Sequence, residues 1–194
     1  MAVLRGIDGS TVALEVDRWR GEPDPHETAL LDRLSDPILD IGCGPGRVPA
    51  LLAAQGRVAL GIDPAPHAVA EARERGAPVL RRSVFRPLPG EGRWGTALLL
   101  DGNVGIGGDP VALLRRCAEL VHPGGGLVLA EVAPPGTPTA PLQVRVEHRG
   151  DAGPWFPWAR VGVDAWAGLA SAAGLAFPGF ERAGSRWFGR ARRP

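Results

Sequence analysis

Residues 37–47 read Pro37-Ile-Leu-Asp-Ile-Gly-Cys-Gly-Pro-Gly-Arg47 and form the most informative pattern in the chain. The short apolar run that ends at Ile41 is typical of a buried β-strand, and residues 47–55 return to helix-forming side chains. The glycine-rich segment between them lets the backbone approach a ligand without obstruction from a Cβ atom. Because ligands of open α/β sheets bind at this end of the strands, we expect a binding site here.

Strands and helices alternate on both sides of this segment. Apolar runs predict further strands at 57–62, 78–82, 96–100 and 127–132. Helical spacing predicts helices at 26–34, 47–55, 66–75 and 111–120, the last of them after the helix start Asp109-Pro110. Five apolar strands separated by helices imply right-handed crossovers and a sheet that is covered on both faces. The predicted class is therefore α/β, with a doubly wound, mostly parallel sheet.

The pattern changes after residue 134. Apolar and polar side chains alternate from Leu142 to Arg149, which is typical of a half-exposed strand, and residues 156–163 are its expected hairpin partner. A short helix is predicted at 164–173. Strand-like runs at 175–182 and 186–190 flank a turn.

Composition limits the classes of function. The chain has 194 residues and a net charge of +1, so it fits one domain and has no overall field for binding nucleic acid or a membrane surface. Its two cysteines lack the number and spacing of a disulfide framework or a zinc site. No apolar run approaches the roughly 18–20 residues of a membrane span, and we expect a cytoplasmic protein. All basic residues are arginine, which is typical of a GC-rich genome and excludes lysine chemistry.

The residues around the glycine loop favour an adenosine-type ligand. The dinucleotide fingerprint requires glycine where this chain has Arg47, so a pyrophosphate is disfavoured. Asp63 ends the second strand, 19 residues after Gly44, at the spacing at which an acidic side chain accepts hydrogen bonds from ribose hydroxyls. The arginine at position 47 and the lack of tyrosine also disfavour an NAD-dependent oxidoreductase.

Three motifs together resemble those of the class I S-adenosylmethionine-dependent methyltransferases, over residues 27–132. They are Ile38-Leu-Asp-Ile-Gly-Cys-Gly-Pro-Gly-Arg47, Gly61-Ile-Asp63 and Val121-His-Pro-Gly-Gly-Gly-Leu-Val128. The resemblance implies a small bacterial methyltransferase with a Rossmann-like fold and S-adenosylmethionine as cofactor. We expect one domain over residues 1–194. Within it, 1–36 form an N-terminal segment and helix, 37–132 the cofactor-binding core, and 133–194 a substrate-covering hairpin and the C-terminal strands.

The resemblance also assigns roles to residues. In that family the glycine loop holds the methionine part of the cofactor, the first acidic residue (here Asp40) supports its amino group, and the second (here Asp63) binds the ribose. The residues after the third strand enclose the adenine, and an acidic residue is often found where this chain has Ser83. The implied cofactor contacts are Asp40, Gly42, Cys43, Gly44, Gly46, Asp63, Pro64, Ser83, Val84, Phe85, Asp101, Gly102 and Asn103, with no metal.

The expected acceptor is a small molecule that is methylated on oxygen or nitrogen. Asp101-Gly-Asn103 follows the fourth strand and differs from the Asp/Asn-Pro-Pro-Tyr motif of many DNA and protein amide methyltransferases. Since positioning alone can lower a barrier by up to about 7–11 kcal/mol, one base at most is needed. His148 and Asp101 are the candidate bases, although His148 also fits a core position. Cys43 fits a packed side chain better than a nucleophile.

Several other segments leave alternatives open. The aromatic stretch 154–158 suits either a substrate wall or core packing. The glycine-rich stretch 104–109 suits close approach to a ligand or a flexible turn. Trp19 either closes over a ligand or anchors the N-terminal segment, and its neighbours Arg18 and Arg20 fit a solvated face.

The run 186–193 mixes arginine with aromatic residues, as an RNA-binding surface would, but a solvated edge strand is the preferred interpretation. We expect no nucleic-acid or membrane partner. An RNA methyltransferase and a non-catalytic protein that binds S-adenosylmethionine are the alternatives to a small-molecule methyltransferase.

Overall fold

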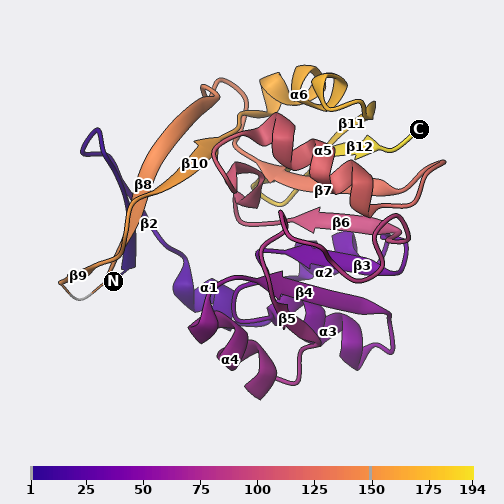
Figure 1. Cartoon of the computed structure of the whole chain (residues 1–194), viewed down its shortest axis with the longest axis horizontal. Helices are drawn as coiled ribbons and strands as arrows, with labels where there is room; N and C mark the ends of the chain where they lie inside the picture. Colours follow the sequence, from indigo (N-terminus) through magenta and orange to yellow (C-terminus); the bar gives the residue numbers. More distant parts are fainter. Residues whose placement is uncertain (1, 149) are drawn as a thin grey trace.

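The computed structural model describes residues 2–148 and 150–194, which form two β-sheets (Figure 1). The larger sheet has seven strands in the order β11-β12-β7-β6-β3-β4-β5. Its parallel part consists of β3 (Ile38–Ile41), β4 (Ala59–Asp63), β5 (Val79–Arg81), β6 (Thr96–Leu99) and β7 (Leu127–Val132). These are the five strands predicted from the sequence, and the doubly wound, mostly parallel α/β class is confirmed.

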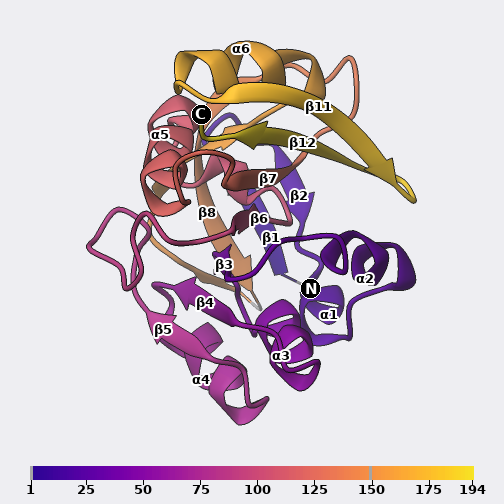
Figure 2. The same cartoon turned by 90° about the vertical axis from the view of Figure 1, so that its right-hand side faces the viewer.

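Helices cover both faces of this sheet. On one face, α2 (Pro25–Leu31) and α3 (Arg47–Ala54) pack against the strands through buried leucines such as Leu30 and Leu52. On the other face, α5 (Pro110–Leu120) and α6 (Trp166–Ala172) pack through Leu113 and Trp166. Figure 2 shows α3 and α5 on opposite sides of the strands. Each leucine buried in this way stabilises the fold by about 1.5–3 kcal/mol relative to an exposed one.

Shorter elements connect these layers. α4 (Pro66–Glu74) follows β4 at the predicted position, and the 3₁₀ helices η1 (Asn103–Gly105) and η2 (Val163–Ala165) precede α5 and α6. Asp109 caps α5 as predicted, because its Oδ1 accepts a hydrogen bond of 3.0 Å from the Ala112 amide. The described helices include none that is both long and apolar enough to span a membrane.

The C-terminal hairpin of β11 (Ala176–Ala183) and β12 (Arg186–Arg192) completes the larger sheet. β12 lies between β7 and β11 and pairs antiparallel with both. The prediction of a solvated edge strand over 186–193 is therefore wrong, because β11 occupies the edge instead. The physical reason is Phe188, which is completely buried in the same hydrophobic cluster as α2 and α3 and holds β12 inside the sheet.

A second, antiparallel sheet stands apart from the larger one, and we call it the cap sheet (Figure 1). It contains β1 (Ala2–Gly6), β2 (Thr11–Ala13), β8 (Ala140–His148), β9 (Asp151–Ala152) and β10 (Phe156–Arg160). The predicted hairpin is confirmed, since β8 pairs with β10 with Trp158 opposite Leu142. The N-terminal strands were missed, because β1 is short and is stabilised by pairing with β8, which lies more than a hundred residues away along the chain.

The glycine-rich stretch 104–109 joins the cap sheet to the larger sheet. Gly105 lies against β10 so closely that a Cβ atom there would approach the Ala159 carbonyl oxygen to 2.1 Å. Gly108 lies against Pro157 on the same strand. The glycines of this stretch therefore allow close contact with a strand of the cap sheet, which the sequence did not predict.

Candidate active site

A cavity of about 1370 Å³ separates the cap sheet from the carboxyl ends of β3, β4, β6 and β7. The larger sheet contributes the glycine loop, Asp63 and the segment after β6 to its wall. A third wall is the short helix α1 (Val16–Arg20), which Figure 1 shows between the cap sheet and α4. The predicted cofactor contacts that line this cavity are Asp40, Gly42, Cys43, Gly44, Asp63, Asp101, Gly102 and Asn103.

The glycine loop has a fixed shape at the end of β3. Gly42 has a positive φ of 73°, and a Cβ atom there would lie 2.6 Å from Nδ2 of Asn103. That amide nitrogen donates to the carbonyl oxygens of Ile41 and Gly42, at 3.0 and 2.9 Å. Only glycine suits position 42, and Asn103 thereby connects the segment after β6 to the loop.

Asp63 lies across the loop at the end of β4. Its Oδ2 accepts a hydrogen bond from the Gly44 amide at 3.1 Å, and its Oδ1 accepts one from the Ala65 amide at 2.8 Å. Burial raises the pKa of this carboxyl, and the two backbone amides act in the opposite direction. The side chain is therefore held in place while it lines the cavity.

Asp40 lies in β3 just before the glycine loop and is buried, with 4% of its surface exposed. Its pKa is raised to about 7, mainly by burial and against the attraction of Arg47. The neighbouring carboxylates of Asp101, Glu27 and Asp63 contribute to this rise. A cation placed in the cavity beside Asp40 would favour the ionised form.

Five residues form a closed ring of ion pairs and hydrogen bonds at the cavity, which we call the charge ring. Oδ2 of Asp101 accepts from Arg47 at 2.5 Å, and Arg47 also pairs with the buried Glu27. Arg186 joins Glu27 at 3.0 Å to Glu131 at 2.5 and 2.7 Å. Oε2 of Glu131 accepts the Asp101 backbone amide at 2.6 Å and closes the ring.

The charge ring fixes Asp101 in an unusual conformation. Its φ is +54°, in the left-handed region that non-glycine residues rarely adopt. Burial raises the pKa of the Asp101 carboxyl, which Arg47 counteracts. Burial alone would also raise the pKa of Glu131, but the hydrogen bonds and charge of Arg186 lower it overall. Oδ1 of Asp101 lies 3.6 Å from both Arg18 and Arg186, so it is less tightly engaged than Oδ2.

The inner face of the cap sheet is apolar where it meets the cavity. Leu4, Leu142 and Val144 line it. Phe156 and Trp158 form an edge-to-face pair there, with ring centroids 6.0 Å apart. Trp155 lies on the opposite side of the strand, with Arg145 stacked 4.8 Å from its ring. Phe156 and Trp158 therefore lie at the cavity, where the substrate-wall alternative for 154–158 needs them, and Trp155 does not.

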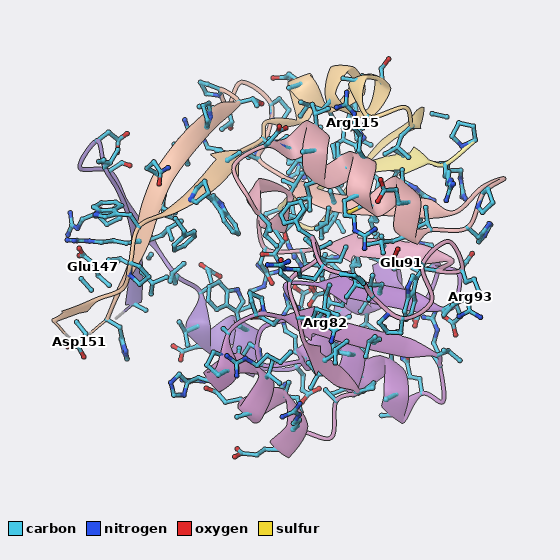
Figure 3. The ribbon with its side chains drawn as sticks, viewed as in Figure 1. Arg82, Glu91, Arg93, Arg115, Glu147 and Asp151 are labelled. Atoms are coloured by element: carbon cyan, nitrogen blue, oxygen red, sulfur yellow. The ribbon has the colours of Figure 1, made fainter. Side chains whose placement is uncertain are left out.

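The outer face of the cap sheet is charged. Glu147 accepts hydrogen bonds from Arg5 at 2.8 Å and from Arg145 at 2.6 and 2.8 Å. Figure 3 shows Glu147 on the side of the cap sheet that faces away from the larger sheet. The candidate base His148 is exposed at the end of β8 and lines the cavity. It lies four residues beyond Val144, which is about 13 Å along an extended strand.

The remaining predicted contacts lie outside this cavity wall. Val84 is buried in the core, whereas Ser83 is half-buried and Phe85 is exposed. Gly46 packs against Ala72 of α4, and Pro64 is exposed beside Asp63. Cys43 is buried, and burial raises the pKa of its thiol, so a packed side chain describes it rather than a nucleophile. Within the described residues, His, Cys, Asp and Glu form no cluster suited to a metal ion.

Sequence reasoning missed most of the charge ring. The signal for Glu131 was a single acidic residue inside an apolar strand, and that for Arg47 was a charge in place of the third glycine of the dinucleotide fingerprint. Arg18 and Arg20 were assigned to a solvated face. That assignment is wrong for Arg18, which is half-buried at the cavity, whereas Arg20 is exposed and pairs with Glu71 of α4 at 2.8 Å.

Comparison with known proteins agrees with this geometry. The family model described as a methyltransferase domain matches residues 23–176, so the chain belongs to that family. A comparison with curated proteins gives no match.

Solved structures share the fold. An S-adenosylmethionine-dependent methyltransferase of Bacteroides fragilis, in complex with S-adenosyl-L-homocysteine, has a TM-score of 0.82 and 19% identity, over 98% of this chain and 86% of the other. The 1,6-didemethyltoxoflavin-N1-methyltransferase of Burkholderia thailandensis has a TM-score of 0.65 and 21% identity, over 92% and 81%. An amino pentose methyltransferase of Micromonospora echinaspora has a TM-score of 0.62 and 17% identity, over 95% and 99%.

The family match identifies the chain as a methyltransferase, and the solved structures share its class I fold. The residues of this chain fit S-adenosylmethionine, the cofactor that the sequence resemblance implies. A buried carboxylate, Asp40, suits its ammonium group, the open glycine loop admits its amino-acid part, and Asp63 is placed to accept hydrogen bonds from a sugar.

Proposed function

We propose that the protein transfers the methyl group of S-adenosylmethionine to an oxygen or nitrogen atom of a small, largely apolar acceptor. The observation that carries this proposal is the cavity, whose one wall holds Asp40 and Asp63 and whose opposite wall is the apolar inner face of the cap sheet. Phe156 and Trp158 offer an aromatic corner to a flat ring. Two of the solved structures described above are likewise named for small acceptors, a didemethyltoxoflavin and an amino pentose.

The cofactor is proposed to lie along the carboxyl ends of β3 and β4. Asp40 pairs with its ammonium group, Gly42–Gly44 cradle its amino-acid part, and Asp63 accepts from its ribose hydroxyls. The segment Ser83–Phe85 follows β5, which pairs with β4, and the Arg82 amide donates to the Asp63 carbonyl oxygen at 3.1 Å. An adenine attached to the ribose would therefore approach this segment.

The acceptor is proposed to lie between the segment after β6 and the cap sheet. Asn103 fastens this segment to the glycine loop, and Gly105 places it against β10, so Asp101 lies where the two halves of the cavity meet. When bound, S-adenosylmethionine supplies an electrophilic methyl group on a sulfonium that leaves as a neutral thioether. Asp101 Oδ1 is the proposed acceptor of the proton that the attacking oxygen or nitrogen loses.

An RNA acceptor is less well supported. The arginines of the C-terminal run are engaged within the fold: Arg186 belongs to the charge ring, Arg190 pairs with Glu181 at 3.1 Å, and Arg193 donates to the Val121 carbonyl oxygen at 2.9 Å. A surface for RNA would need such groups to be available to phosphates.

Methyl-labelled S-adenosylmethionine tests the acceptor class. The purified protein is incubated with the label and a bacterial extract, and the products are separated into an ultrafiltrate, protein and RNA. We expect enzyme-dependent label in the ultrafiltrate. Label confined to the RNA or protein fraction would contradict the proposal, and the Asp63→Ala variant controls for label that this site does not transfer.

A further inference from the structure

The guanidinium of Arg18 is incompletely used by the protein. Nη1 lies 3.6 Å from Asp101 Oδ1, which is longer than a hydrogen bond. Nη2 is buried, and among residues 2–148 and 150–194 it has no hydrogen-bond partner. Buried N–H groups in folded proteins are almost always paired, so an unpaired one at a cavity wall indicates a ligand contact.

Helix α1 holds this side chain in position. Arg20 forms a two-fold hydrogen bond with Glu71 of α4, at 2.8 Å for each contact. Arg75, which follows α4, donates to the Gly21 carbonyl oxygen at 3.0 Å and to that of Arg20. These bonds fix α1 to α4, and Arg18 reaches from α1 towards Asp101.

The unpaired nitrogen of Arg18 favours an anionic ligand. Arg47 and Arg186 are each bonded directly to two carboxylates of the charge ring, and these bonds satisfy Glu27 and Glu131. Among the three arginines, only Arg18 has a buried guanidinium nitrogen without a hydrogen-bond partner in the described residues. A carboxylate suits this group best, because a guanidinium presents paired donors that match two carboxylate oxygens.

We propose that Arg18 binds a carboxylate in the cavity, so that α1 recognises this group of a ligand. The proposal rests on the proposed function. The first source of the carboxylate is the amino-acid part of the cofactor, because its ammonium and carboxylate share one carbon, and Asp40 and Arg18 line the same cavity. The second source is a carboxylate on the acceptor.

Titration calorimetry with two matched ligands tests the proposal. S-adenosylhomocysteine carries the carboxylate, and its decarboxylated analogue, S-adenosyl-3-thiopropylamine, keeps the adenosine, sulfur and amine. The Arg18→Gln variant is expected to bind S-adenosylhomocysteine about 10- to 100-fold more weakly and the analogue unchanged within about twofold. Arg18→Lys should recover part of the loss, because it keeps the charge without the paired donors.

Arg5→Gln is the matched control, since Arg5 pairs with Glu147 on the outer face of the cap sheet. It should bind both ligands like the wild type, and thermal unfolding of each variant checks that it is folded. If the wild type binds neither ligand, the proposed function fails rather than this inference.

A second experiment tests whether the acceptor supplies the carboxylate. It compares the binding of 4-hydroxybenzoate and of its amide to the complex with S-adenosylhomocysteine. A preference for the carboxylate that disappears in Arg18→Gln, with unchanged binding of S-adenosylhomocysteine, would assign Arg18 to the acceptor. The proposal is overturned if a folded Arg18→Gln variant binds S-adenosylhomocysteine like the wild type and shows no altered preference between the two probes.

Discussion

At the scale of single residues, Asp40 is a buried carboxyl group that we propose to pair with an ammonium group. Burial moves its pKa to about 7, so near neutral pH the group changes between a neutral acid and a carboxylate. The protonated acid has no charge to pair with an ammonium group. The ionised carboxylate does pair with it. The proposed cofactor contact is therefore coupled to a proton.

This coupling predicts a pH dependence of binding. Below pH 7 a proton must leave Asp40 before the ammonium can pair with it, so the affinity for S-adenosylhomocysteine should fall by about tenfold per pH unit, and above pH 7 it should level off. Titration calorimetry from pH 5.5 to pH 8.5 measures the profile. Asp40→Asn should bind weakly with a nearly flat profile, and a flat profile in the wild type would refute the coupling.

Residues of the site differ in how far the sequence predicts them. Asp40, Asp63 and Asn103 line the cavity as expected. Each lies at or shortly after the end of a strand that the apolar pattern predicts. The roles of Arg18 and Arg186 depend on partners far away along the chain, such as Asp101 and Glu27. No local pattern predicts such pairs, because only the assembled fold brings them together.

At the scale of elements, the charge ring ties α2 and α3 to β7 and β12. Glu27 has 1% of its side chain exposed and receives one hydrogen bond from each of two arginines. Removing one partner of a buried ion pair leaves uncompensated charge, which costs about 3–5 kcal/mol. The ring therefore connects the position of α2 to the conformation of Asp101.

Glu27→Ala should lower the free energy of unfolding by about 3–5 kcal/mol, because Arg47 and Arg186 each lose a partner. Urea denaturation followed by circular dichroism measures the change. Arg33→Ala on the exposed pair with Glu181 should change it by less than about 1 kcal/mol. Equal effects of the two substitutions would show that the charge ring contributes no more than a surface pair.

The close contact between η1 and β10 should make the protein sensitive to a larger side chain at Gly105. Gly105→Ala should destabilise the protein by at least about 1 kcal/mol, because the new Cβ atom would lie 2.1 Å from the Ala159 carbonyl oxygen. Gly168→Ala is the matched change, since that site lies in α6 with nothing within 4 Å, and it should stabilise by about 1 kcal/mol. Urea denaturation measures the free energy of unfolding of both variants. An unchanged value for Gly105→Ala would contradict the close packing.

Elements were predicted well wherever hydrophobic periodicity was local. The five parallel strands and the helices between them follow from it, as does the β8–β10 hairpin. β12 was misplaced, since its arginines suggested exposure while Phe188 made the strand internal. β1 and β2 were missed because both are short, and β1, with which β2 pairs, depends on β8 more than a hundred residues away.

At the scale of the whole molecule, the cavity is built from segments spread between residues 2 and 161. The family match begins at residue 23, yet β1, β2 and α1 precede it and line the cavity. The parallel sheet thus supplies the side that we assign to the cofactor, and the N-terminal segment joins β8 and β10 in enclosing the opposite side. Differences in acceptor should therefore be sought in the cap sheet rather than in the glycine loop.

The most direct test of the account is the affinity of S-adenosylhomocysteine for Asp63→Ala. Asp63 reaches the cavity while two backbone amides hold its carboxylate, and we assign the ribose hydroxyls to it. In a variant that circular dichroism shows to be folded, calorimetry should give a loss of about 10- to 100-fold relative to the wild type. Affinity equal to that of the wild type would contradict the proposed placement of the cofactor.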